Sequence, residues 1–130
     1  MAFLIHTTAD GHQPPWEYLP CDDIQPHLGM AMVLTGGLLA KAGSTAKPTY
    51  ISMYEAPAAL AEGDIIPVIR VTEDIIFETE NSASLSGVAI GAKVTLASDG
   101  MRVTGTTTSG VAEIVAKDAD AVGSRVLVKF

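Results

Sequence analysis

Cysteine, basic residues and aromatic side chains are all scarce in this 130-residue chain. Cys21 is the only cysteine, so an intramolecular disulfide is impossible, and the sequence is consistent with folding in a reducing cytoplasm. No apolar run approaches the ~20 residues that a membrane-spanning helix needs. The first residues also lack the basic segment of a secretory signal. We therefore expect a protein that is made in the cytoplasm and has no membrane partner.

Lysine and arginine together number eight, against 15 aspartates and glutamates, which leaves a formal net charge of −7. The basic residues are scattered singly, whereas phosphate binding requires clustered positive charge. The sequence thus argues against nucleic acid as a partner. An acidic surface suits either solubility or a basic partner protein, and composition does not separate the two.

Valine, isoleucine, threonine and glycine are abundant instead, and this composition favours short strands joined by tight turns. Over residues 90–104, apolar and polar residues alternate ahead of an Asp99-Gly100 turn, which predicts a hairpin. Residues 28–41 show the same pattern around a pair of glycines. The chain therefore contains two candidate hairpins of similar design.

The rest of the chain predicts further short strands and at most one turn of helix. Residues 64–71 form a dense apolar strand, and Pro67 inside it indicates an edge strand or a bulge. Residues 75–80 alternate, with two glutamates facing water or a basic partner. A single helical turn is expected near residues 57–62.

The two hairpins match each other at several positions, and the match continues into the strands that follow them. Residues 50–52 correspond to 113–115, and residues 61–68 correspond to 121–128. The alternative is that an all-β chain simply reuses similar hairpins. The matched hairpin positions are Gly29 with Gly91, Met32 with Val94, and Leu34 with Leu96.

These patterns together predict an all-β fold with two similar halves, 28–71 and 90–130. About eight short antiparallel strands with regular turns favour a small β-barrel or β-tulip-like domain over residues 28–130. Closure of such a barrel would remove exposed strand edges.

Residues 1–27 differ from the remainder and predict an extended N-terminal arm outside the core. The arm is rich in proline, which stiffens the backbone. It also holds the apolar residues Phe3 and Ile5 and the aromatic residues Trp16 and Tyr18. Aromatic side chains on a stiff arm are good interface anchors, so these four are the candidate contacts to a partner protein or to another protomer. The alternative is that they cover the barrel of their own chain.

No constellation in the chain predicts catalysis, a metal ion or a cofactor. The arm histidines could be imagined as metal ligands, but their spacing fits no zinc pattern. Cys21 lacks a partner that would activate it as a nucleophile. Neighbouring carboxylates lie on turns and strand faces, where they are usually solvated. An enzyme would need an arm histidine beside a carboxylate; the histidines are His6, His12 and His27.

Residues 28–130 resemble the head decoration, or capsid cement, proteins of tailed bacteriophages and prophages. The resemblance is a style of strands and glycines rather than a set of chemical groups. The stretches that carry it are 29–42, 47–53, 106–115 and 122–130, which begin with Gly29-Met30-Ala31, Lys47-Pro48-Thr49, Thr106-Thr107-Thr108 and Val122-Gly123-Ser124.

This resemblance implies a structural virion protein without enzymatic activity or cofactor. Such a protein sits on the outside of the head, commonly as a homotrimer, and clamps the lattice of the major capsid protein. Its N-terminal arm often makes the capsid contact, which by this resemblance would involve Phe3, Ile5, Trp16 and Tyr18. Two alternatives stay open. One is a ligand-binding β-barrel with a site between the two halves, and the other is a β-rich tail or fibre module.

Overall fold

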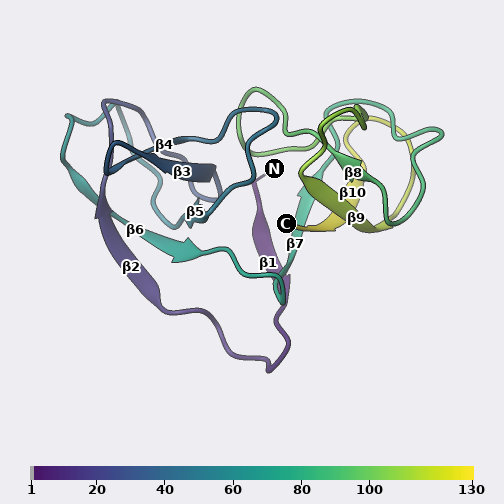
Figure 1. The fold of residues 1–130 in the computed structure, drawn as a ribbon, viewed down its shortest axis with the longest axis horizontal. Coiled ribbons are helices and arrows are strands. Elements are labelled where there is room, and N and C mark those ends of the chain that lie inside the picture. The colour runs from purple at the N-terminus through teal and green to yellow at the C-terminus, as the bar shows by residue number, and fades with distance from the viewer. Residues whose placement is uncertain (1) are drawn as a thin grey trace.

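The computed structural model describes residues 2–130, and these residues form strands and loops but no helix. Nothing in that range is therefore a helix that could span a membrane. All neighbouring strands are antiparallel, so the all-β class is confirmed (Figure 1). The strands are β1 (Leu4–Thr7), β2 (Trp16–Pro20), β3 (Ala31–Thr35), β4 (Leu38–Lys41), β5 (Tyr50–Ser52), β6 (Ile65–Arg70), β7 (Ile76–Glu80), β8 (Lys93–Val94), β9 (Ala112–Lys117) and β10 (Arg125–Lys129).

The strands form two five-stranded sheets that do not close into a barrel. Sheet I has the order β2-β6-β5-β3-β4, and sheet II has the order β1-β7-β10-β9-β8. Figure 1 shows the two sheets as two lobes, with β1 lying between them. Because the sheets stay open, both retain edge strands, which a closed barrel would have removed.

The two halves share one strand topology, which confirms the predicted pair of similar halves. The order β2-β6-β5-β3 in sheet I is repeated as β7-β10-β9-β8 in sheet II, with the strands in the same sequence order along the chain. Sheet I adds β4 at the far side of β3, and sheet II adds β1 beside β7. The repeated unit therefore begins at β7 in the second half and at β2 in the first, and β2 lies inside the segment that was expected to be a separate arm.

Equivalent backbone hydrogen bonds support this correspondence residue by residue. The amide of Gly29 donates to the Ser52 carbonyl at 2.7 Å, and that of Gly91 donates to the Ile114 carbonyl at 2.8 Å. Both glycines have positive φ angles, 82° and 92°. Gly29 and Gly91 are thus equivalent as predicted, whereas Ser52 corresponds to Ile114 and not to Val115, a register error of one residue.

Equivalent backbone hydrogen bonds also occur at the residue that follows β2 and at the residue that follows β7. Cys21 N–H donates to the Asp64 carbonyl and its carbonyl accepts from Gly63 N–H, both at 2.8 Å. In the second half, Asn81 makes the matching bonds, at 3.2 and 2.9 Å. Residues 16–21 and 63–68 therefore correspond to residues 76–81 and 123–128.

The core draws on both sheets and on the N-terminal segment. A large cluster joins Phe3, Ile51 and Ile69 to Phe77 and the other inward residues of sheet II. A smaller cluster lies on the other face of sheet I, around Met32, Leu39 and Cys21. The prediction that residues 1–27 stay outside the core is wrong, because Phe3 is 1% exposed and Cys21 is fully buried.

Two local predictions are also corrected. Pro67 lies in β6, which pairs with β2 on one side and β5 on the other, so it marks neither an edge nor a bulge. The nitrogen of Pro67, which carries no hydrogen, faces the residue just after β5. On the same side, the Pro67 carbonyl accepts a hydrogen bond from Met53 N at 3.0 Å. Residues 57–62 form a loop, because the amides of Ala56 and Leu60 donate to carbonyls of the segment that follows β2.

Candidate functional site

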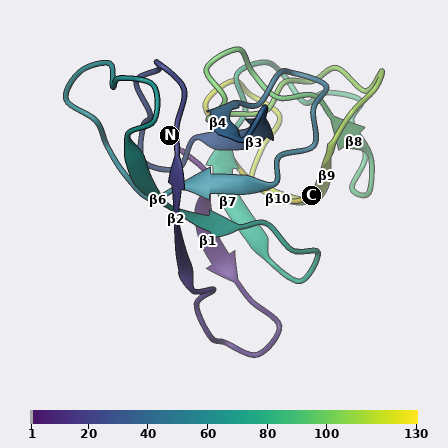
Figure 2. The ribbon, with the colours of Figure 1, turned by 60° about the vertical axis from the view of Figure 1, so that its left-hand side comes forward.

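The most prominent exposed apolar surface lies on β2 and β6. Trp16, Tyr18 and Ile65 are 51%, 64% and 65% exposed, respectively. The strand register explains why they share a face: Tyr18 lies opposite Pro67, and Pro20 lies opposite Ile65. Directly opposed and alternate residues point to the same side of an antiparallel sheet. Figure 2 shows β2 and β6 side by side at one side of the molecule.

The second half has a charged pair where this surface has apolar side chains. Tyr18 corresponds to Glu78 and Ile65 corresponds to Arg125, as the registers of β2 with β6 and of β7 with β10 show. Arg125 Nη1 lies 3.2 Å from Glu78 Oε1, and Arg125 also contacts Asp118. These contacts raise the pKa of Arg125 above its usual range, chiefly through the hydrogen bond to Asp118. The same backbone positions therefore carry charged side chains in one half and largely apolar side chains in the other.

Trp16 and Tyr18 are the predicted contact residues that the structure leaves accessible. Phe3 is not available as a surface contact, because its ring packs edge-on against Phe130 with centroids 5.4 Å apart. Ile5 is half-buried against the same cluster. Sequence reasoning missed Ile65, because nothing in the dense apolar run of residues 64–71 distinguishes an exposed side chain from a buried one.

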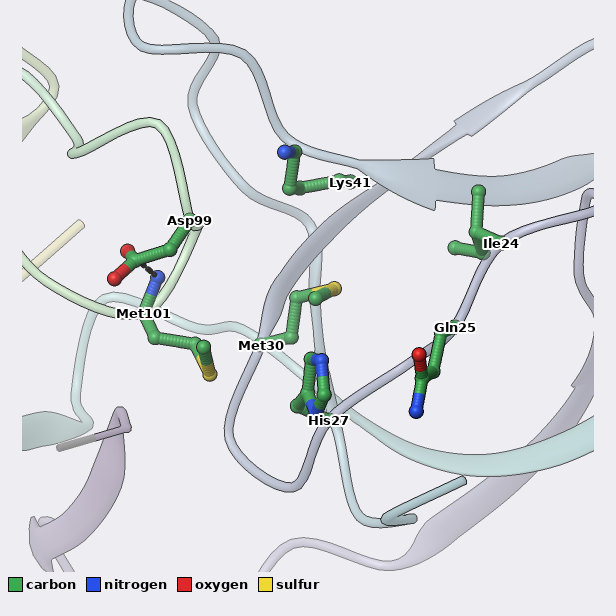
Figure 3. A pocket seen from close by; sticks show the side chains of 7 residues that line it. All are labelled: Ile24, Gln25, His27, Met30, Lys41, Asp99 and Met101. Carbon is green, nitrogen blue, oxygen red and sulfur yellow. Dashed lines mark hydrogen bonds between the residues drawn. The ribbon is translucent and has the colours of Figure 1, made fainter. Parts of the chain in front are cut away.

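A pocket of about 350 Å³ lies where the two halves meet (Figure 3). Met30 and Lys41 come from the first hairpin, and Asp99 and Met101 come from the turn of the second. Burial raises the pKa of Asp99, but hydrogen bonds from Met101 N and Arg102 Nε outweigh it, so the net pKa is lowered. The pocket is open to solvent, and Ile24, Gln25 and His27 complete its wall, so apolar and polar side chains both line it.

His27 is the one arm histidine that the structure places at the pocket beside a glutamate. Its Nδ1 lies 2.5 Å from Glu55 Oε2, and Glu55 also accepts from Leu28 N at 3.2 Å. Both contacts lower the pKa of Glu55, with the His27 hydrogen bond the larger cause. This carboxylate ties the segment of His27 and Leu28 to the segment of Glu55.

The other candidate reactive residues are dispersed. His6 contacts Thr7, and His12 contacts Asp10. Burial, followed by the nearby Asp64 carboxylate, raises the pKa of Cys21, which keeps the thiol protonated and inert. In residues 2–130 no three histidine, cysteine, aspartate or glutamate side chains gather as a metal site.

Fold and surface together define an all-β protein of two similar halves with an exposed aromatic and aliphatic surface on one of them. Comparisons with protein-family models, with curated proteins and with solved structures gave no match.

Proposed function

We propose that this protein is a structural virion protein that binds the outside of a tailed-phage head and stabilises the lattice of the major capsid protein. The observation that carries the proposal is the exposed surface of Trp16, Tyr18 and Ile65. Aromatic residues on rigid elements are the usual anchors of protein interfaces. The resemblance of residues 28–130 to head decoration proteins supplies the identity of the partner.

A homotrimer is the favoured assembly in this proposal, because a ring multiplies one modest contact. Once one protomer docks, the others bind at high effective concentration, so the combined affinity exceeds that of a single site by orders of magnitude. No cofactor is needed for such a role. The net charge of −7 further suits a partner surface that carries basic residues.

Co-sedimentation with purified heads tests the function. Wild-type protein is expected to sediment with expanded heads of the phage or prophage whose genome encodes it. A Trp16→Ser, Tyr18→Ser double variant should lose at least about tenfold in affinity, as interface anchors usually do. The matched control is Ile90→Ser with Val122→Ser, which removes two residues of the other half that are 57% and 63% exposed. Failure of the wild type to sediment, or equal loss in the control, would contradict the proposal.

A ligand-binding protein is the second candidate, and the pocket between the halves favours it. Its volume, and its combination of apolar side chains with convergent polar groups, suit a small-molecule site. Filling the pocket with Met101→Trp should abolish binding of any ligand found by screening while leaving head binding intact. Loss of head binding in that variant would instead place the capsid contact at the pocket.

A further inference from the structure

The edge of β2 is open at the position where its equivalent strand, β7, is covered. In sheet II, β1 pairs with β7, with Leu4 opposite Glu78 and Ile5 opposite Phe77. Glu78 and Phe77 correspond to Tyr18 and Glu17 of β2. Sheet I ends at β2, so among residues 2–130 no strand occupies the equivalent place beside Tyr18. The chain therefore contains, within itself, one filled and one unfilled copy of the same strand position.

The backbone of β2 offers hydrogen bonds at this edge. Pro67 turns its carbonyl towards β5, where Met53 N donates to it at 3.0 Å. Tyr18, directly opposite Pro67, is therefore in a non-hydrogen-bonded pair with β6, and its own N–H and C=O point to the open edge. The same alternation applies to Trp16. Beyond Pro20 the edge is used, because Asp22 N donates to the Leu39 carbonyl of β4 at 2.9 Å.

The charge of the half that carries the open edge indicates the kind of strand that would fit. Residues 16–74 contain eight acidic and three basic residues, whereas residues 75–130 contain six acidic and five basic residues. Glu62 and Asp64 are exposed in the turn that leads into β6, and Asp23 is exposed just after β2. Arg70, on β6, is engaged by Glu17 at 3.0 Å. The half that carries the open edge is thus the strongly acidic one.

We propose that the open edge of β2 at residues 16–18 accepts an antiparallel strand from a basic partner protein. The incoming strand has apolar residues that lie on Trp16 and Tyr18 and has lysine or arginine beside its paired segment. A second copy of this chain is disfavoured because it would bring the same acidic residues to the same edge. The inference rests on the proposed function only for the identity of the partner, a capsid subunit.

Trp16 supplies a direct test, since it is the only tryptophan and is half-exposed on this edge. The probe is a short synthetic peptide of alternating valine and threonine with lysines at both ends. Binding should shift Trp16 emission to shorter wavelength and slow hydrogen exchange at the Tyr18 amide. The same peptide with glutamates at its ends should bind several-fold more weakly, and the difference should shrink with added salt. Unchanged exchange at Tyr18 would overturn the proposal.

Variants separate the edge from the adjoining surface. Tyr18→Pro removes the outward N–H, whereas Tyr18→Val keeps it, so only the proline variant should lose peptide binding at the edge. If Tyr18→Pro does not fold, Ile65→Lys serves in its place and should weaken binding of the lysine-flanked peptide, with Val122→Lys as the matched control. Equal binding by Ile65→Lys and the wild type would contradict the proposed contact.

Two further outcomes keep this proposal distinct from the proposed function. A blue shift of Trp16 on concentrating the protein alone would identify a second copy as the occupant and overturn the basic partner. Peptide binding without head binding would leave the edge site standing and remove the capsid role. Head binding that is unaffected by Tyr18→Pro would leave the capsid role standing and remove the edge of β2 as its contact.

Discussion

Single positions in the two halves share a backbone and differ in chemistry. Cys21 and Asn81 make matching backbone hydrogen bonds, yet Cys21 is an apolar filler, whereas the Asn81 amide donates to the carbonyls of Asp120 and Ala121. Tyr18 and Glu78 differ in the same way at the surface. The residue type at each position therefore depends on its local surroundings, and the shared backbone hydrogen bonds are compatible with both residue types.

Asp99 should make the stability of the protein depend on acid pH. It accepts from Met101 N and Arg102 Nε, both at 2.8 Å, and its pKa is lowered in the folded state. A lowered pKa means that its contribution is present above about pH 4 and is lost as pH falls through the folded-state pKa. Asp99→Ala should cost about 1–2 kcal/mol near neutral pH. Urea unfolding at neutral pH and at pH below 3 should show that cost shrinking in acid.

The control for Asp99 is Asp23→Ala, which removes an exposed carboxylate of the first half. Its effect should be within about 0.5 kcal/mol. A cost for Asp99→Ala that stays constant with pH would contradict the assigned role of the carboxylate.

At the scale of elements, the two equivalent hairpins differ in what lies beside them, because residues 2–3, just before β1, contact only the first hairpin, at Gly29. Gly29 and Gly91 occupy the same place with positive φ angles. A Cβ on Gly29 would lie 2.8 Å from the Phe3 carbonyl oxygen, whereas a Cβ on Gly91 would meet nothing within 4 Å. The N-terminal segment thus presses against the entry to the first hairpin.

This difference predicts unequal effects of the same substitution. Gly91→Ala should cost about 1–2 kcal/mol through left-handed backbone strain alone. Gly29→Ala carries the same strain and must in addition displace the backbone of residue 3, so its cost should be clearly larger. Chemical denaturation of both variants measures the difference. Equal costs would show that residues 2–3 do not contact Gly29 in solution.

At the scale of the whole molecule, one core joins both halves, so they are expected to unfold together. Phe3 from the N-terminal segment and Phe77 and Phe130 from sheet II pack with Ile51 and Ile69 from sheet I. Interfaces of this kind make unfolding cooperative, because neither half buries its apolar face alone.

Phe3→Ala tests that coupling through a distant reporter. Removing this buried ring should cost about 3–5 kcal/mol. The loss should also lower the unfolding midpoint reported by Trp16 in sheet I, although Phe3 lies beside sheet II. Leu4→Ala, an exposed neighbour, is the control and should have little effect. Two separate transitions, with Trp16 unaffected, would contradict the single core.

The sequence on its own determined the all-β class, the glycine-centred turns and the duplication, because each depends on local alternation and on backbone conformations that glycine permits. The Asp99-Gly100 turn is present, with Gly100 N donating to the Ala97 carbonyl at 3.0 Å. Phe77 and Thr79 are buried while Glu78 and Glu80 face outward, as the period-two pattern predicted. The pairing of β1 with β7 and of β2 with β6 was missed, because no local signal specifies a distant partner.

Only the tertiary structure decided which apolar residues remain exposed. Phe3 and Trp16 are both aromatic residues of one short segment, yet Phe3 is buried against Phe130 and Trp16 stays half-exposed. The reason is that exposure depends on which strand lies beside each residue and on whether that strand has a further neighbour. The open edge of β2 likewise depends on the tertiary structure, because β1 pairs with β7 and not with the equivalent strand β2.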